Sequence, residues 1–213
     1  MEFLDPQLSK YVEEHTEGES ALLKKINRDT NAHVLMPRML SGHLQGRVLS
    51  MISSMVRPKN ILEIGTFTGY SALCLAEFLD PEGEITTIDI NEELEARVRE
   101  YFKASGKEKQ INYLIGNALK IIPSLTKMYD IVFIDADKKN YSQYFDLTID
   151  KVRKGGFILA DNVLWSGKVI QSILKKDADL EAILEFNDKV HNDPRVSNVL
   201  FPIRDGLMVL RKN

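Results

Sequence analysis

The chain of 213 residues contains little of several features that mark particular classes of protein. It has one cysteine, Cys74, so no disulfide can form within the chain, and we expect a reducing, cytoplasmic setting. Its 28 basic residues against 31 acidic ones give a net charge of −3, which lacks the basic excess of proteins that coat nucleic acids. No apolar run approaches the roughly 18 residues of a membrane span. The first residues, MEFLDPQLSKYVEE, lack the basic segment and apolar stretch of a signal peptide. We therefore expect an intracellular globular protein with no membrane partner.

Apolar periodicity divides the sequence into two parts. Residues 1–58 have helical spacing, with Ser20 in a capping position before one helix and Pro58 ending another. In residues 59–213, short apolar runs alternate with helical segments. The runs are residues 60–62, 85–88, 111–115, 131–134 and 157–160, and the helical segments are about 70–79, 92–104, 117–125 and 141–153.

Runs that are apolar on both faces, each followed by a helix, are typical of a parallel sheet covered on both sides. A last helix, about residues 180–191, precedes runs at 196–201 and 207–210. Only five residues join these two runs, too few for a crossover helix, which predicts an antiparallel hairpin at the sheet edge. We predict one α/β domain over residues 1–213: a Rossmann-like, doubly wound, mostly parallel seven-stranded sheet with an antiparallel C-terminal hairpin strand and a helical N-terminal extension.

Acidic residues stand at the ends of four of the expected parallel strands: Glu63, Asp89, Asp135 and Asp161. In an open α/β sheet, ligands bind beyond the carboxyl ends of the strands. For each acid alone, a helix cap or a solvated loop residue is the favoured explanation. Four carboxylates at one edge, however, repel one another unless something positive lies among them. We expect a cationic ligand, a metal, or both.

The turn after the first expected strand contains two glycines, in Glu63-Ile64-Gly65-Thr66-Phe67-Thr68-Gly69-Tyr70-Ser71. Glycines permit a tight turn and close approach of a ligand. The turn is neither G-x-G-x-x-G nor the phosphate-binding G-x-x-x-x-G-K-[ST], which argues against a nicotinamide-dependent dehydrogenase. Glu63 would repel a pyrophosphate and suits a cationic group, whereas Asp89 is placed to bond ribose hydroxyls. A nucleoside with a positive charge describes S-adenosylmethionine.

Three motifs together resemble those of the small cation-dependent O-methyltransferases, in particular the bacterial members. That family includes caffeoyl-CoA O-methyltransferase and, more distantly, catechol O-methyltransferase. The motifs are the glycine turn above, Asp135-Ala136-Asp137-Lys138 followed by Asn140-Tyr141, and Asp161-Asn162-Val163-Leu164-Trp165-Ser166-Gly167. Further matches at residues 116–118 and 202–207 extend the resemblance over about residues 39–211.

The resemblance implies a set of cofactor-binding residues. The methionine part of the cofactor would lie against Glu63, Gly65, Thr66 and Ser71, the ribose against Asp89, and the adenine beside Ala118. Further contacts would come from Ser41, in a loop that closes over the cofactor or metal, and from Asp135, Asp137 and Tyr144.

The resemblance also implies a divalent cation bound by Asp135, Asp161 and Asn162. Oxygen ligands without histidine or cysteine suit Mg²⁺, while an Asx turn is the alternative for Asp161-Asn162. Lys138 corresponds to the family's catalytic lysine, acting beside Asp135, and its neighbour Lys139 serves as a control. Trp165 and Ser166 are expected to form a wall of the acceptor site, although Trp165 is equally well explained as an anchor for its loop.

The predicted reaction transfers a methyl group to one hydroxyl of a vicinal dihydroxy aromatic small molecule. A phenol has a pKa near ~10; chelation of two adjacent oxygens favours the phenolate and orients it, and Lys138 would take the proton. The segment 168–180 and the N-terminal helices would shape the acceptor pocket. The alternative acceptor is a wobble 5-hydroxyuridine of tRNA, which a basic side of the N-terminal helices could approach, although that side is equally well explained as a solvated helix face. Its residues are Lys24, Lys25, Arg28, Arg38 and Arg47. From the family and the apolar hairpin we also expect a homodimer.

Overall fold

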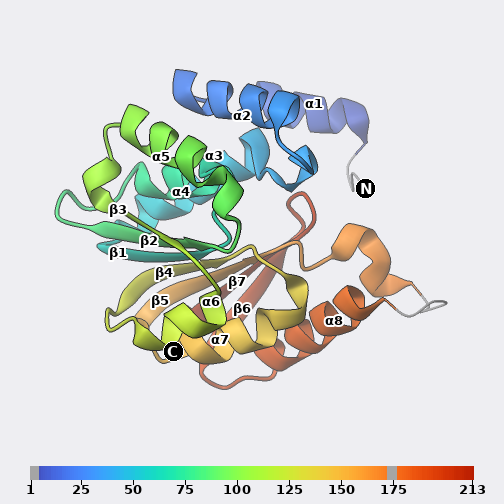
Figure 1. Ribbon diagram of the computed structural model, residues 1–213. Helices are drawn as coiled ribbons and strands as arrows, with labels where there is room; N and C mark the ends of the chain where they lie inside the picture. The colour runs from blue at the N-terminus through green and yellow to red at the C-terminus, as the bar shows by residue number, and fades with distance from the viewer. Residues whose placement is uncertain (1–4, 172–176) are drawn as a thin grey trace.

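The computed structural model describes residues 5–171 and 177–213 and contains a seven-stranded sheet (Figure 1). Its strands are β1 (Asn60–Ile64), β2 (Glu84–Asp89), β3 (Ile111–Ile115), β4 (Tyr129–Ile134), β5 (Val152–Asp161), β6 (Val196–Phe201) and β7 (Leu207–Lys212). The strand order is β3-β2-β1-β4-β5-β7-β6. The first five strands are parallel, and β7 runs antiparallel to both β5 and β6. The predicted Rossmann-like sheet and its C-terminal hairpin are therefore confirmed.

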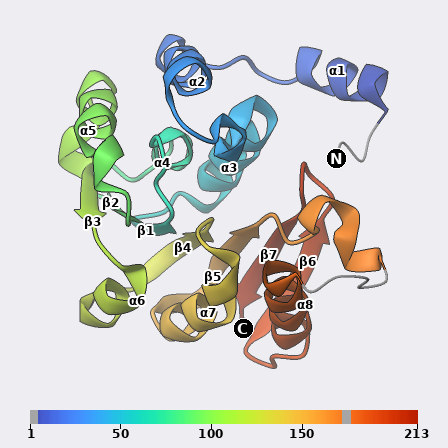
Figure 2. The same cartoon turned by 45° about the vertical axis from the view of Figure 1, so that its right-hand side comes forward.

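Helices cover both faces of this sheet. They are α1 (Pro6–Glu14), α2 (Ala21–His33), α3 (Gly42–Val56), α4 (Tyr70–Ala76), α5 (Glu95–Ala104), α6 (Ala118–Ile121), α7 (Tyr141–Ile149) and α8 (Ala178–His191). Figures 1 and 2 show α3, α4 and α5 on one face and α6, α7 and α8 on the other, with α2 outside the first layer. Among the residues described, no helix is long and apolar enough to cross a membrane.

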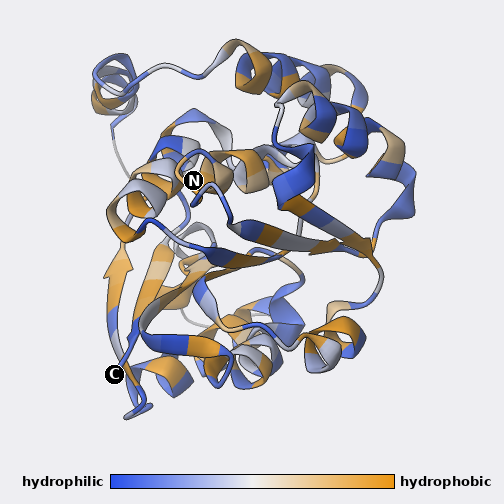
Figure 3. Ribbon diagram, turned by 90° about the vertical axis from the view of Figure 1, so that its left-hand side faces the viewer, coloured by the Kyte–Doolittle hydropathy of each residue, from blue (hydrophilic) through white to orange (hydrophobic). Residues whose placement is uncertain are grey.

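Apolar side chains of the strands point alternately to the two faces of the sheet and form an apolar layer on each. Both faces are therefore covered by helices. In β1, Ile61 packs into the layer with α3, α4 and α5, whereas Leu62 and Ile64 pack into the layer with α7 and α8. Successive side chains of a strand point to opposite faces, so both sides of β1 are buried. Figure 3 shows the resulting apolar stretches of strand between the helical layers.

Several element boundaries differ from those predicted. The segment expected to be helical over residues 141–153 ends at Ile149, because Val152 already pairs with Tyr129 as the first residue of β5. The helix expected over 117–125 has only four residues and continues as a 3₁₀ turn around Pro123, which has no N–H to donate. The helix expected over 70–79 ends at Ala76. The Ser20 cap is confirmed, since its hydroxyl accepts a hydrogen bond from Leu23 N at 3.2 Å.

A buried ion pair fastens α3 to α4. The Arg47 guanidinium donates to both carboxylate oxygens of Glu77, at 3.0 and 2.6 Å, and Ser50 Oγ donates to the same carboxylate at 2.5 Å. The Arg47 side chain is only 10% exposed. From the sequence, Arg47 is expected on a basic side of the N-terminal helices. The structure instead places it against Glu77, so it does not belong to a basic surface. Lys25 is also paired, with Asp29.

Removing Glu77 leaves the Arg47 guanidinium, which is 10% exposed, with only the Glu17 carboxylate, 3.9 Å away, as its acidic partner among the residues described. We expect Glu77→Ala to lower the free energy of unfolding by about 2–3 kcal/mol, measured by urea denaturation. Glu14→Ala, which breaks the exposed Lys10–Glu14 pair on α1, should cost less than about 0.5 kcal/mol. Equal effects of the two substitutions would contradict a structural role for the Arg47–Glu77 pair.

Candidate active site

A cleft of about 1750 Å³ opens at the carboxyl ends of the parallel strands. It lies where the strand order reverses between β1 and β4, the usual ligand position in open α/β sheets. Typical small-molecule pockets measure about 300–1000 Å³, so this cleft has room for two ligands side by side. Of the predicted site residues, the lining includes Ser41, Gly65, Asp89, Ala118, Asp135, Asp137, Lys138, Tyr144, Asn162, Trp165 and Ser166.

The glycine turn after β1 brings the backbone against the neighbouring strand. Gly65 has φ of +102°, and a Cβ at this position would overlap the carbonyl oxygen of Asp135. Asp89, at the end of β2, accepts hydrogen bonds from Phe67 N at 2.6 Å and Asn91 N at 2.8 Å. Two backbone amides thus fix the Asp89 carboxylate at the cleft wall.

Glu63 lies fully buried beneath the cleft rather than in its wall. One carboxyl oxygen accepts a hydrogen bond from the Thr87 hydroxyl, while Oε1 has no hydrogen-bond partner in the part of the chain that the structure describes. Burial raises the pKa of Glu63 to about 8; the carboxylates of Asp135 and Asp89 act in the same direction, and nearby hydroxyls oppose it. An orphaned acidic oxygen of this kind fits a positively charged hydrogen-bond donor.

Thr66 and Ser71 do not line the main cleft, although both were predicted to touch the cofactor. They line a void of about 10 Å³ beside it, together with Ser41 and Gly65. The Thr66 hydroxyl instead lies 2.6 Å from the Thr87 hydroxyl, inside the sheet. Thr66 thus supports the Glu63 carboxyl through Thr87.

Lys138 brings the predicted metal ligands together. Its ammonium lies 2.9 Å from Asn162 Oδ1, 3.4 Å from Asp135 Oδ1 and 3.5 Å from the carbonyl oxygen of Asp161, and it donates to the Tyr141 hydroxyl. Burial and the neighbouring Asp161 raise the pKa of Asp135, and Lys138 opposes this. The oxygens of three residues therefore converge on one positive charge.

The donor set suits a hard cation. Within the described residues there is no group of three His, Cys, Asp or Glu side chains able to hold a metal. The predicted set, by contrast, combines two carboxylates with one amide, all oxygen donors. Asp161 Oδ1 accepts a hydrogen bond from the N–H of the next residue, Asn162, at 2.8 Å. An Asx turn would need the N–H two residues on, so this contact is not one.

Asp137 and Tyr144 contact each other at the cleft, whose lining also includes Ala118. The Tyr144 hydroxyl donates to Asp137 Oδ1 at 2.5 Å, and Asn140 donates to the second oxygen. Burial and this hydrogen bond raise the pKa of Tyr144, so the hydroxyl stays protonated and remains a donor. The predicted cofactor residues of this region therefore share one surface.

Trp165 lines the cleft and also anchors its loop. Its indole N–H lies 3.3 Å from Oδ2 of Asp177, the residue that caps α8. This contact fits the expected anchor, whereas a wall of the acceptor site stays a prediction. Lys168 and Asp179 of the segment 168–180 also line the cleft, whereas residues 172–176 lie outside those described.

Two residues at the cleft were given no role from the sequence. Arg204 lines the cleft and donates to the carbonyl oxygens of Leu40 and Ser41, and Asp205 accepts from Ser166 N at 2.5 Å. The only signal was the motif match at residues 202–207, which marked the segment without indicating what its side chains contact.

Comparison with known families shows which family the chain belongs to. The family model described as O-methyltransferase matches residues 13–213. The chain belongs to this O-methyltransferase family. It is an S-adenosylmethionine-dependent O-methyltransferase.

Relatives of this O-methyltransferase extend over most of its length. It is 31% identical to a probable caffeoyl-CoA O-methyltransferase 2 of Dictyostelium discoideum, over 95% of this chain and 90% of the relative. It is 35% identical to the caffeoyl-CoA O-methyltransferase of Medicago sativa, over 79% of this chain and 72% of the relative. Among solved structures, an SAH-bound methyltransferase of Podospora anserina has a TM-score of 0.90 at 27% identity, covering all of both chains. An O-methyltransferase of Bacillus cereus in complex with SAH has a TM-score of 0.89 at 26% identity, covering 97% of each chain.

The buried Glu63 should make the stability of the cofactor-free O-methyltransferase depend on pH. Between its ordinary pKa of 4.5 and about 8, the folded protein keeps the Glu63 proton that the unfolded chain has released, so stability falls as pH rises through this range and levels off above it. Glu63→Gln cannot ionise. We expect its stability relative to the wild type to increase steadily from pH 5 to pH 8 in urea unfolding experiments without cofactor. Parallel pH profiles for the two proteins would show that Glu63 is not held neutral.

Proposed function

We propose that the enzyme methylates one hydroxyl of a vicinal dihydroxy aromatic small molecule with the help of a divalent cation, Mg²⁺ by the chemistry of the ligands. The observation that carries this proposal is that the Asp135 carboxylate and the Asn162 amide oxygen converge on the Lys138 ammonium at the cleft, with the main-chain carbonyl oxygen of Asp161 beside them. Oxygens that already surround one positive charge, at the edge of a cavity with room for an acceptor, suit a cation that binds two adjacent hydroxyls.

Asp135, Asp161 and Asn162 would hold the cation. When bound there, it supplies a Lewis acid that favours the ionised form of the acceptor hydroxyl. Asn162 lies at the cleft surface, whereas Asp161 is only 2% exposed and lies behind it. Asn162 and Asp135 would therefore face the acceptor, and Asp161 would close the site from the protein side.

The cofactor would occupy the opposite end of the cleft. Asp89, fixed by two amides, would accept hydrogen bonds from the ribose hydroxyls, and the adenine would lie beside Ala118 near Asp137 and Tyr144. The orphaned oxygen of Glu63 would face the amino group of the methionine part, with Gly65 permitting the close approach. This arrangement points the methyl group at the acceptor.

Lys138 would take the proton from the acceptor hydroxyl. It lies beside Asp135 and Asn162, and its contact with the Tyr141 hydroxyl holds the amine at the cleft. Lys139, the next residue, is exposed. Of these two adjacent lysines, Lys138 is the one that lines the cleft, and it is therefore the one proposed for acid–base work on an acceptor.

The second candidate acceptor remains a wobble 5-hydroxyuridine of tRNA. Arg38 lines the cleft and is exposed, which favours it, but Arg47 is buried against Glu77 and Lys25 is paired with Asp29. The small phenolic acceptor is therefore the first proposal. A homodimer also remains proposed, with the edge strand β6 as its surface, where Val199 is 54% exposed.

The cation and cofactor residues should separate in binding experiments. We expect Asn162→Ala to abolish methyl transfer to a catechol while leaving the affinity for S-adenosylhomocysteine unchanged in calorimetric titration. Asp89→Ala should weaken that affinity about tenfold or more, because a charged hydrogen bond is lost. EDTA should mimic Asn162→Ala in the wild type, and added Mg²⁺ should reverse it. Full activity in chelator would remove the cation from the proposal.

Lys138→Ala should reduce turnover by about 10²–10⁴-fold with little change in the apparent affinity for the cofactor, since a general base acts in the transition state. Lys139→Ala is the matched control and should be nearly silent. The Lys138 defect should shrink for a nitrocatechol, whose hydroxyl is already acidic. An equal loss for acidic and ordinary catechols would show that proton removal is not the role of Lys138.

A further inference from the structure

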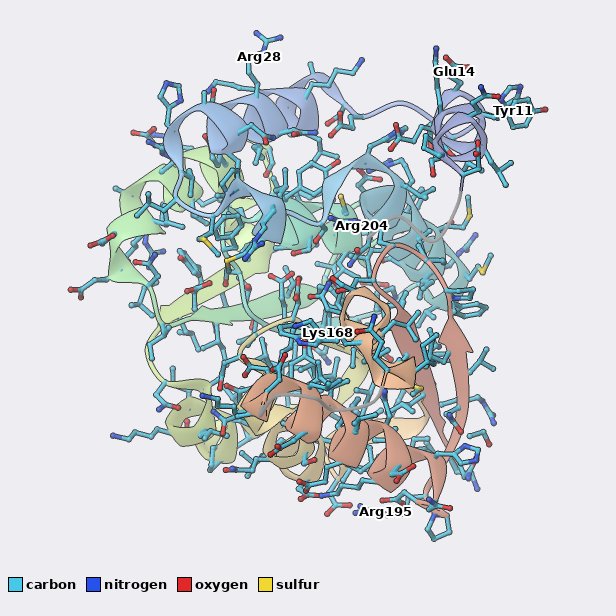
Figure 4. All side chains as sticks on the ribbon, turned by 90° about the vertical axis from the view of Figure 1, so that its right-hand side faces the viewer. Tyr11, Glu14, Arg28, Lys168, Arg195 and Arg204 are labelled. Atoms are coloured by element: carbon cyan, nitrogen blue, oxygen red, sulfur yellow. The ribbon has the colours of Figure 1, made fainter. Side chains whose placement is uncertain are left out.

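The turn between β6 and β7 reaches back to the cleft and contacts both segments that flank it. This turn, residues 202–206, follows Phe201 and precedes Leu207. Figure 4 shows Arg204 near the centre of the molecule, close to the N-terminal helices, and Arg195 at the opposite end of the hairpin. Two neighbouring side chains of the turn make these contacts: Arg204 contacts the segment before α3, and Asp205 contacts the loop after β5.

Arg204 holds the segment on the cofactor side. Its Nη1 donates to the carbonyl oxygens of Leu40, at 3.0 Å, and Ser41, and to Gln45 Oε1 at 3.2 Å. These acceptors lie where the chain enters α3, and Ser41 lines the small void beside the glycine turn. One guanidinium from the C-terminal end of the chain thus fixes a segment about 160 residues away in sequence.

Asp205 holds the loop on the acceptor side. Its Oδ1 accepts from Ser166 N at 2.5 Å, and its carbonyl oxygen accepts from Leu164 N at 2.9 Å. The next residue continues the contact, because the carbonyl oxygen of Gly206 accepts from Val163 N at 3.2 Å. The loop that presents Asn162 and Trp165 is therefore bonded along its length to the turn.

That loop needs such support because its backbone is strained. Asn162, Trp165 and Ser166 have φ values of +59°, +46° and +54°. Positive φ is uncommon for residues other than glycine, and it persists only where surrounding contacts hold it. The Asp205 carboxylate bonds to one of these three residues directly.

We propose that Arg204 and Asp205 form a positioning pair for the methyl-transfer reaction: Asp205 holds the strained loop that presents Asn162 and Trp165 to the acceptor, and Arg204 holds the Leu40–Ser41 segment over the cofactor. The assignment of one side of the cleft to the acceptor and the other to the cofactor rests on the proposed function. The contacts themselves are independent of it. Neither residue needs to touch a reacting atom.

Trp165 provides a readout that needs neither acceptor nor cation, because it is the only tryptophan of the sequence. We expect Asp205→Ala to shift the tryptophan emission to longer wavelength and to increase its quenching by acrylamide. In activity assays the same variant should raise the acceptor KM about tenfold, the loss expected for one hydrogen bond to a carboxylate. Its affinity for S-adenosylhomocysteine should stay within about twofold of the wild type.

Two further variants test the cause of these effects. Asp205→Asn keeps an oxygen that can accept from Ser166 N, and should restore the emission and the KM. In the double variant Asp205→Ala with Ser166→Gly, glycine adopts the positive φ without cost, so both readouts should also recover in large part. These variants keep the test open if Asp205→Ala alone fails to fold.

Arg204→Met should give the opposite pattern, with about tenfold weaker binding of S-adenosylhomocysteine and unchanged tryptophan emission. Asp193→Ala is the control: it breaks the Asp193–Arg195 pair at the far end of the hairpin and should change neither readout. If Asp205→Ala and Asp205→Asn lower the melting temperature alike and leave the emission unchanged, the proposal is overturned. If no catechol is methylated by the wild type, the proposed function fails, while emission and cofactor affinity still decide the positioning roles.

Discussion

The structure depends on how the protein tolerates negative charge at one edge of its sheet. Four acids lie at or near the carboxyl ends of parallel strands: Glu63, Asp89, Asp135 and Asp161. Asp135 lies close enough to both Glu63 and Asp161 for the carboxylates to repel one another. Each is stabilised differently. Asp89 accepts hydrogen bonds from two backbone amides, and burial raises the pKa of Glu63. Asp135 lies beside Lys138, and Asp161 accepts a hydrogen bond from Asn162 N. The proposed ligands, which carry positive charge, would relieve the remaining repulsion, so that binding would also compensate the charge at this edge.

Much of this arrangement could be predicted because it is local in sequence. The apolar runs and their helices follow from periodicity, and the acids are found by counting to the end of each run. Since parallel strands share an edge, Glu63, Asp89, Asp135 and Asp161 had to lie near one another once the strands were assigned. The helix boundaries were less accurate at residues 117–125 and 141–153, where Pro123 and the early start of β5 override helical propensity.

What could not be predicted depends on contacts between distant parts of the chain. Nothing near Thr66 in sequence shows that its hydroxyl points to Thr87 rather than to a ligand. Arginine is usually found at the protein surface, and only the approach of α4 to α3 buries Arg47 against Glu77. Likewise, the bonds of Arg204 to Leu40 and Ser41 join the two ends of the chain, which no motif spacing records.

The cleft is one continuous cavity from Ala118 and Asp89 at one end to Asn162 and Trp165 at the other. A molecule that joins an adenosine to a catechol through a short linker would therefore meet no wall between the two halves. Once one half of such a molecule is bound, the other half is already held near its site, so it loses less translational and rotational entropy on binding. For the acceptor proposed above, the cavity would favour bisubstrate inhibitors whose linker spans the two halves of the cleft.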